Sequence, residues 1–118
     1  MSVEKDAASL AMLRADAEAL LSVIQDARDR IYSRKERGEQ GLEADFRFAN
    51  SMSEGIKETM EKVGGFARSH IYSKDGVIMT RGSHAHDKLK DLLDKIPRRL
   101  LKARVAARRL ERYNQIGP

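Results

Sequence analysis

Apolar residues recur along the first third of the chain at the spacing of an amphipathic helix. From Leu10 onward they alternate steps of three and four residues, the two core positions of successive heptads. The residues of this stripe are Val3, Leu10, Leu13, Ala17, Leu20, Ile24, Ala27 and Ile31. The pattern predicts one long helix over residues 3–33, with acids in its first turn and bases in its last, as the helix dipole prefers.

This first stripe has two alternative partners. It could pack inside the chain's own bundle, or it could form a coiled-coil seam with a second copy of the chain. Ala17 and Ala27 favour the first alternative, because they are small for a seam. We take the second, a homo-oligomer, as the working prediction and leave the first open. The predicted oligomer interface is Leu10, Leu13, Leu20, Ile24 and Ile31.

A polar stretch with two glycines, residues 34–41, interrupts the pattern and is long enough to reverse the chain. The apolar stripe then resumes at Leu42, Phe46, Ala49, Met52, Ile56, Met60 and Val63. It predicts a second helix over residues 42–63, antiparallel to the first and ending at the glycine pair 64–65. A capping-box motif that begins at Ser51 and a helix-weakening Gly55 allow a restart inside this helix.

Residues 69–81 differ from the rest of the chain and predict a β-hairpin. Two runs rich in β-branched and aromatic residues, 70–73 and 77–80, flank the pair Asp75 and Gly76. An Asp-Gly pair between such runs is a strong hairpin signal, because glycine accepts the positive φ of the turn. A lone hairpin is marginal in water, so this one should pack on the helices or pair with a strand of another chain.

The last periodic segment, residues 84–113, predicts a third helix with Ser83 as its N-cap. Its apolar stripe stays in phase across Pro97, so the helix is either kinked there or split in two at Ile96. The whole chain, residues 1–118, is therefore predicted to be a single, mainly α domain. We expect a bundle of about three long helices, the first two an antiparallel pair, with the hairpin before a basic, proline-kinked C-terminal helix.

Positive charge is concentrated in this third helix. Residues 95–112 hold eight Lys or Arg against one acid, Glu111, a net charge of +7, whereas the whole chain carries +5. The cations lie opposite one apolar face, which is made of Ile96, Leu100, Ala103, Ala107 and Leu110. Arginine suits phosphate and carboxylate groups, because its guanidinium donates two parallel hydrogen bonds.

We therefore predict a non-enzymatic nucleic-acid-binding protein that contacts phosphates through this helix. The predicted contact residues are Arg98, Arg99, Lys102, Arg104, Arg108, Arg109 and Arg112. Tyr113 is the only aromatic residue on that face, so base stacking should be minor and binding weakly sequence-specific. The choice between DNA and RNA stays open.

A structural role is the alternative. The protein would then be an assembly scaffold, a virion component, a chaperone or another adaptor. Its basic helix would dock on an acidic protein partner, and the hairpin would pair with a partner's strand.

Other chemistry is sparse in this sequence. There is no cysteine, no glycine-rich phosphate loop and no dinucleotide motif. Ser83, His86 and Asp87 lie too close in sequence for a nucleophilic triad. The three histidines, His70, His84 and His86, flank the hairpin. They would hold a metal only if the fold brought them together. We expect no enzyme activity, no cofactor and no metal.

Hydropathy gives no sign of a membrane protein. No apolar run reaches 18 residues, and the opening residues lack an apolar segment of signal-peptide length. We therefore expect a cytoplasmic protein that does not insert into a membrane.

Overall fold

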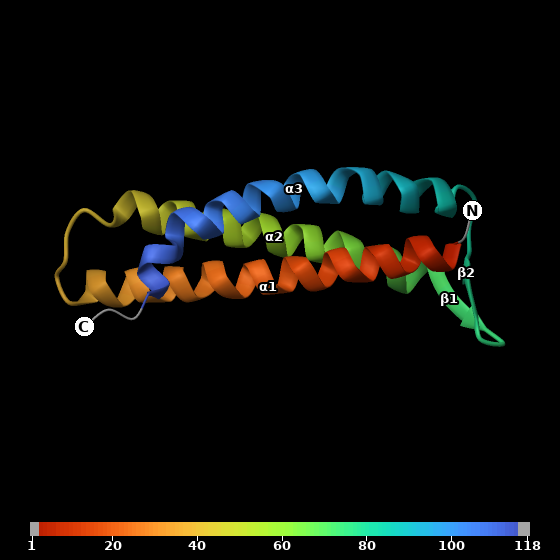
Figure 1. Ribbon diagram of the computed structural model, residues 1–118, viewed down its shortest axis with the longest axis horizontal. Coiled ribbons are helices and arrows are strands. Elements are labelled where there is room, and N and C mark those ends of the chain that lie inside the picture. Colours follow the sequence, from red (N-terminus) through yellow and green to blue (C-terminus); the bar gives the residue numbers. More distant parts are fainter. Residues whose placement is uncertain (1–2, 116–118) are drawn as a thin grey trace.

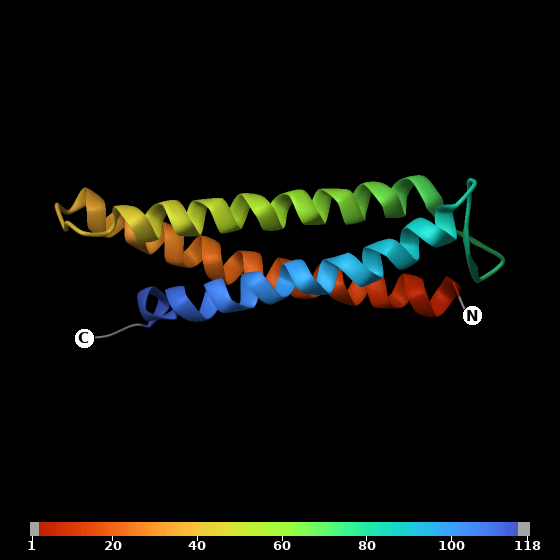
Figure 2. The ribbon, with the colours of Figure 1, turned by 90° about the horizontal axis from the view of Figure 1, so that it is seen from above.

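The computed structural model describes residues 3–115, which form three long helices and one β-hairpin (Figure 1). In chain order the elements are α1 (Val3–Glu36), α2 (Glu43–His70), β1 (Ile71–Lys74), β2 (Val77–Thr80) and α3 (Ala85–Asn114). Helix α2 runs back along α1, and α3 returns in the direction of α1 (Figures 1 and 2). The predicted mainly α bundle with an antiparallel first pair and an interposed hairpin is confirmed.

The bundle is elongated. Its extents are 57 × 24 × 19 Å, and its radius of gyration is 17.8 Å. A compact chain of this length would have a radius of roughly 13–14 Å. The chain is therefore a rod, in which α2 and α3 contact each other less extensively than either contacts α1.

The stripe of α1 forms the centre of the core. Its buried members are Leu10, Ala17, Ile24, Ala27 and Ile31, and Leu13 and Leu20 pack against them. Ala17 and Ala27 are fully enclosed, which lets the neighbouring helices approach α1 closely. The predicted oligomer-interface residues thus serve the intrachain packing that the sequence left as an alternative. A homo-oligomer would have to use other surfaces, and its existence stays a prediction.

Helix α2 is longer than its sequence pattern predicts. The predicted end at the glycine pair 64–65 is wrong, because the helix continues to His70. Phe66 carries the buried stripe past the glycines, and its burial offsets the conformational cost of a helical glycine. Gly64 is itself buried, and a Cβ there would lie 3.1 Å from Nη1 of Arg68. The glycine therefore leaves room for a neighbouring side chain and does not end the helix.

Neither of the predicted interruptions breaks a helix. Helix α2 passes through Ser51 and Gly55 without a restart, and α3 passes through Pro97 without a split. Ile96 and Leu100 are both buried, so the same core face holds α3 on either side of the exposed proline ring. The ribbon of α3 arches along its neighbours in place of a break (Figure 2).

The start of α3 also differs from the prediction. The residue before the helix is His84, not Ser83, and no side chain caps the helix. His84 adopts a left-handed conformation with φ 62°. The chain therefore enters α3 through a sharp turn from the hairpin.

The hairpin has the predicted turn. Lys74 pairs with Val77, and the two residues between them, Asp75 and Gly76, have φ values of 53° and 77°. Two successive positive φ values define the tight hairpin turn that Asp-Gly favours. The strands contact the ends of α1 and α2, and the turn projects beyond the bundle (Figure 1). The outer strand positions are less covered, since Val77 is 53% exposed.

Candidate nucleic-acid interface

The third helix has the two faces that its sequence predicts. Its apolar face is buried at Ile96, Leu100, Ala103, Ala106, Leu110 and Tyr113. All seven predicted contact residues have exposed side chains: Arg98, Arg99, Lys102, Arg104, Arg108, Arg109 and Arg112. Exposure alone does not make them available, because several are paired with acids of the same chain.

Two of the seven form loose surface ion pairs. Nη2 of Arg98 lies 3.6 Å from Asp94, one turn earlier in α3. Nη2 of Arg104 lies 3.6 Å from Asp16 of α1. All four side chains are about half exposed or more, so each pair contributes roughly 0.2–1 kcal/mol. The charges of Arg98 and Arg104 are therefore partly neutralised by aspartates of the same chain.

Arg109 and Arg112 belong to a tighter cluster around Asp45, near the start of α2. The Asp45 side chain is only 13% exposed and accepts hydrogen bonds from Arg112 and from the hydroxyl of Tyr113. Nη2 of Arg109 approaches it to 3.4 Å. The hydroxyl of Tyr113 and the guanidinium of Arg112 hold the pKa of the Asp45 carboxyl below its usual value. This cluster fastens the end of α3 to α2.

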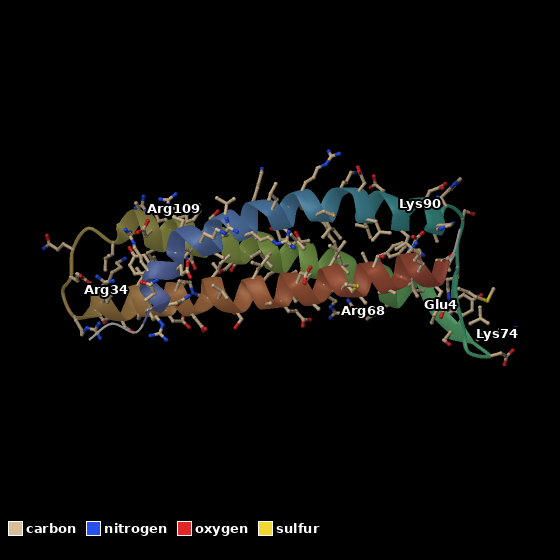
Figure 3. All side chains as sticks on the ribbon, in the orientation of Figure 1. Glu4, Arg34, Arg68, Lys74, Lys90 and Arg109 are labelled. Carbon is tan, nitrogen blue, oxygen red and sulfur yellow. The ribbon has the colours of Figure 1, made fainter. Side chains whose placement is uncertain are left out.

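The same cluster removes Tyr113 from consideration as a stacking residue. Its ring is buried at 6% exposure, and burial raises the pKa of its hydroxyl, which stays protonated as a donor to Asp45. The aromatic residue nearest the basic face is instead Phe48 of α2, whose ring lies 4.2 Å from the guanidinium carbon of Arg109. Figure 3 shows Arg109 at this end of the bundle.

The remaining three residues of the predicted set are unpaired: Arg99, Lys102 and Arg108 have no ion pair or hydrogen bond within residues 3–115. Arg99 and Lys102 lie on the side of α3 that faces α2. Lys62 of α2 lines the same groove and is likewise unpaired within the described chain. Three cations from two helices thus converge on one groove. Arg108 does not line it.

The groove has a volume of about 300 Å³. Its α2 side includes three small residues, Ser51, Gly55 and Thr59, beside Met52, Ile56, Glu58 and Lys62. A Cβ at Gly55 would meet nothing within 4 Å. Thr59 donates its hydroxyl to the carbonyl of Gly55 at 3.0 Å, so this hydroxyl already has a partner. Ile56 and Leu100 are nearly fully buried beneath the groove. We call this cleft, with Lys62, Arg99 and Lys102 on its walls, the basic groove.

The basic groove continues towards the hairpin end of the bundle. A second hollow of about 220 Å³ shares Thr59, Lys62 and Arg99 with it and adds Asp91 and Lys95. Nζ of Lys95 lies 3.0 Å from Asp91, so this pair adds no net charge. Glu58 is the one acid among the residues that line the first part. The groove as a whole therefore keeps a net positive charge along the seam between α2 and α3.

Lys62 was missed by sequence reasoning, which placed every contact on the third helix. A lone lysine in a helix with many charges does not indicate a binding site. The spacing of Ser51, Gly55 and Thr59 does indicate a groove, because residues four apart lie on one side of a helix and these three are small. That side of α2 can leave a groove beside its neighbour.

The three histidines do not converge. Each contacts a different group. His70 Nδ1 lies 3.1 Å from the carbonyl oxygen of Arg81, His84 Nδ1 lies 3.6 Å from Asp87, and His86 Nε2 lies 3.2 Å from Asp6. Residues 3–115 contain no group of three side chains placed to hold a metal ion. The contact of His86 with Asp6 joins the first turns of α1 and α3, which makes it a structural contact.

None of the helices between residues 3 and 115 is long and apolar enough to cross a membrane. The chain matches no known family, no curated protein and no solved structure. The geometry and charge of the basic groove therefore carry the functional argument by themselves.

Proposed function

We propose that this protein binds nucleic acid through its sugar–phosphate backbone, without catalysing a reaction. The observation that carries the proposal is the convergence of Lys62, Arg99 and Lys102 on one groove, with no carboxylate of the described chain paired to any of them. Unpaired cations on two helices retain their charge for an external anion. A row of phosphates is the anion that a long seam between helices suits best.

The ion pairs within the chain reduce the set of cations that we expect to contact phosphates. Arg109 and Arg112 hold α3 against α2 through Asp45, and Arg98 and Arg104 already have acidic neighbours. The binding set is therefore smaller than the charge of α3 suggests and includes a residue of α2. Backbone phosphates are common to every sequence, and no aromatic ring lines the basic groove. Binding should accordingly vary little with base sequence.

The adaptor alternative uses the same cations on carboxylates in place of phosphates. The continuity of the groove favours phosphates, because Thr59, Lys62 and Arg99 line both of its parts. A linear polyanion can follow such a path, whereas surface carboxylates of a folded partner are scattered. Phosphate is also the group for which the bidentate donors of Arg99 are well shaped.

The test compares two arginines of the same helix. Fluorescence anisotropy with a labelled oligonucleotide at low salt should show binding by the wild type. Arg99→Ala should weaken it for every sequence, whereas Arg104→Ala, which removes a cation already neighboured by Asp16, should weaken it less. Lys62→Ala should behave like Arg99→Ala. Wild-type affinity in both groove variants, or no binding by the wild type, would rule the proposal out.

A further inference from the structure

Two large aliphatic side chains lie exposed in the middle of α3, outside the basic groove. Leu101 is 60% exposed and Val105 is 62% exposed. With Phe48 and Met52 of α2 they line a shallow depression of about 480 Å³, whose other lining residues are Lys102, Ala106 and Arg109 of α3. Met52 and Lys102 also line the basic groove. We call the four residues Phe48, Met52, Leu101 and Val105 the apolar shelf.

Single exposed aliphatic residues are ordinary on protein surfaces and need no explanation. The apolar shelf differs because it is continuous across two helices and follows a helical repeat. Leu101 and Val105 lie at the centre of an outward stripe with steps of three and four residues: Arg98, Leu101, Val105, Arg108 and Arg112. This is the spacing at which one helix packs along another. Helix α3 therefore presents two apolar residues flanked by arginines, opposite the stripe that forms the core.

The charges around the shelf restrict what can cover it. Lys102 and Arg108 lie on either side of Val105 in the sequence, and both are unpaired within residues 3–115. The same face of a second copy would bring like charges together, so self-association through this stripe is unfavourable. A nucleic-acid duplex presents sugars and phosphates outward and would leave Leu101 and Val105 uncovered. Only a partner with both carboxylates and apolar side chains matches the stripe.

We propose that the apolar shelf is the docking site for an acidic amphipathic helix of a protein partner. Apolar side chains of that helix, three or four residues apart, cover Leu101 and Val105 and reach Met52, beside the Phe48 ring that Arg109 partly covers. The flanking carboxylates of that helix pair with Arg108 and with Lys102, which also lines the basic groove, so the partner helix and a nucleic acid compete for Lys102. This mode of recognition, a helix laid in an apolar groove, takes its affinity from the anchors and its orientation from the charged rim.

The test uses a labelled designed helix as the probe. The probe has leucines at steps of three and four residues and glutamates at the flanking positions. One control peptide replaces the leucines by serine, and a second replaces the glutamates by lysine. Anisotropy should show that the wild type binds the probe better than either control. The double substitution Leu101→Ser and Val105→Ser should weaken binding about tenfold or more, since both anchors lose their apolar contact.

Met12→Ser is the matched control, because Met12 is 69% exposed on α1 and is not part of the shelf. It should leave probe binding unchanged. The double variant should keep the circular dichroism of the wild type and its affinity for oligonucleotide, which separates this proposal from the one for the basic groove.

Three results would each overturn the docking proposal. The first is a probe that does not bind the wild type at about 100 μM. The second is a probe that binds the double variant as well as it binds the wild type. The third is a double substitution that abolishes binding to an oligonucleotide or to anionic lipid vesicles, which would assign the shelf to those partners.

Discussion

The hydroxyl of Tyr113, at the end of α3, donates a hydrogen bond to the carboxylate of Asp45, near the start of α2. The two residues are 68 positions apart in the sequence. Arg112 and Arg109 approach the same carboxylate, so one largely buried acid holds the last turn of α3. The third helix is therefore positioned by its C-terminal end as well as by its apolar stripe.

Removal of this acid should loosen the bundle. Asp45→Ala leaves the buried hydroxyl of Tyr113 without its acceptor, which should lower the free energy of unfolding by about 1–3 kcal/mol. Urea denaturation at neutral pH, followed by circular dichroism, measures the change. Tyr113→Phe removes only the donor and should cost less. Equal stability of Asp45→Ala and wild type would show that the cluster does not support the fold.

The same carboxyl predicts a pH dependence. Its pKa is lower in the folded chain than in the unfolded one, so its contribution is complete above the unfolded pKa of about 4. The contribution is then lost as the pH falls through the folded value. Asp45→Asn should therefore unfold with a shallower dependence on pH below about 4 than the wild type. Parallel acid-unfolding curves for the two proteins would contradict this reasoning.

The hairpin turn predicts a destabilising substitution. Gly76 has a φ of 77°, a conformation that a β-branched residue adopts only with strain. Gly76→Val should lower the free energy of unfolding by about 1–2 kcal/mol.

Gly55→Ala is the opposite case, because Gly55 lies inside a helix with open space around it. Gly55→Ala should raise the free energy of unfolding by about 1 kcal/mol. Thermal denaturation of the two variants measures both changes. Stability changes of the same sign in the two variants would contradict these expectations.

Truncation of two adjacent leucines of α3 should change stability to very different extents. Leu100 is 1% exposed and lies in the core, whereas Leu101 is 60% exposed. Leu100→Ala should therefore cost about 2–5 kcal/mol. Leu101→Ala should change stability by no more than about 0.5 kcal/mol. Denaturation midpoints of the two variants decide the point, and a large loss with Leu101→Ala would mean that the outer stripe is covered in the protein itself.

The local patterns of the sequence predicted the type and order of the elements of this fold, but not all of their ends. The stripe from Leu10 to Ile31 predicts α1 because helical spacing and burial coincide along it, and Asp75 with Gly76 predicts the turn because only certain residues accept positive φ. Such signals are local. The end of α2 was missed because Phe66 is buried beyond the glycine pair and continues the core face, which no local pattern reveals.

The candidate site was only partly predictable for the same reason. The charge of α3 identified Arg99 and Lys102, but the sequence could not tell these from Arg112, whose partner Asp45 lies 67 residues away. Whether a cation is free depends on which acids the fold brings beside it. Lys62 joins the groove only because α2 and α3 lie side by side.

The dependence of oligonucleotide binding on salt concentration measures how many phosphates the basic groove contacts. Three phosphate contacts, from Lys62, Arg99 and Lys102, predict that log K falls with log[salt] at a slope of about −2.7 for duplex DNA. Arg99→Ala should reduce the magnitude of that slope by about one unit, and Arg104→Ala should change it less. A slope near zero, or a wild-type slope retained by Arg99→Ala, would contradict the assignment of the basic groove to phosphate binding.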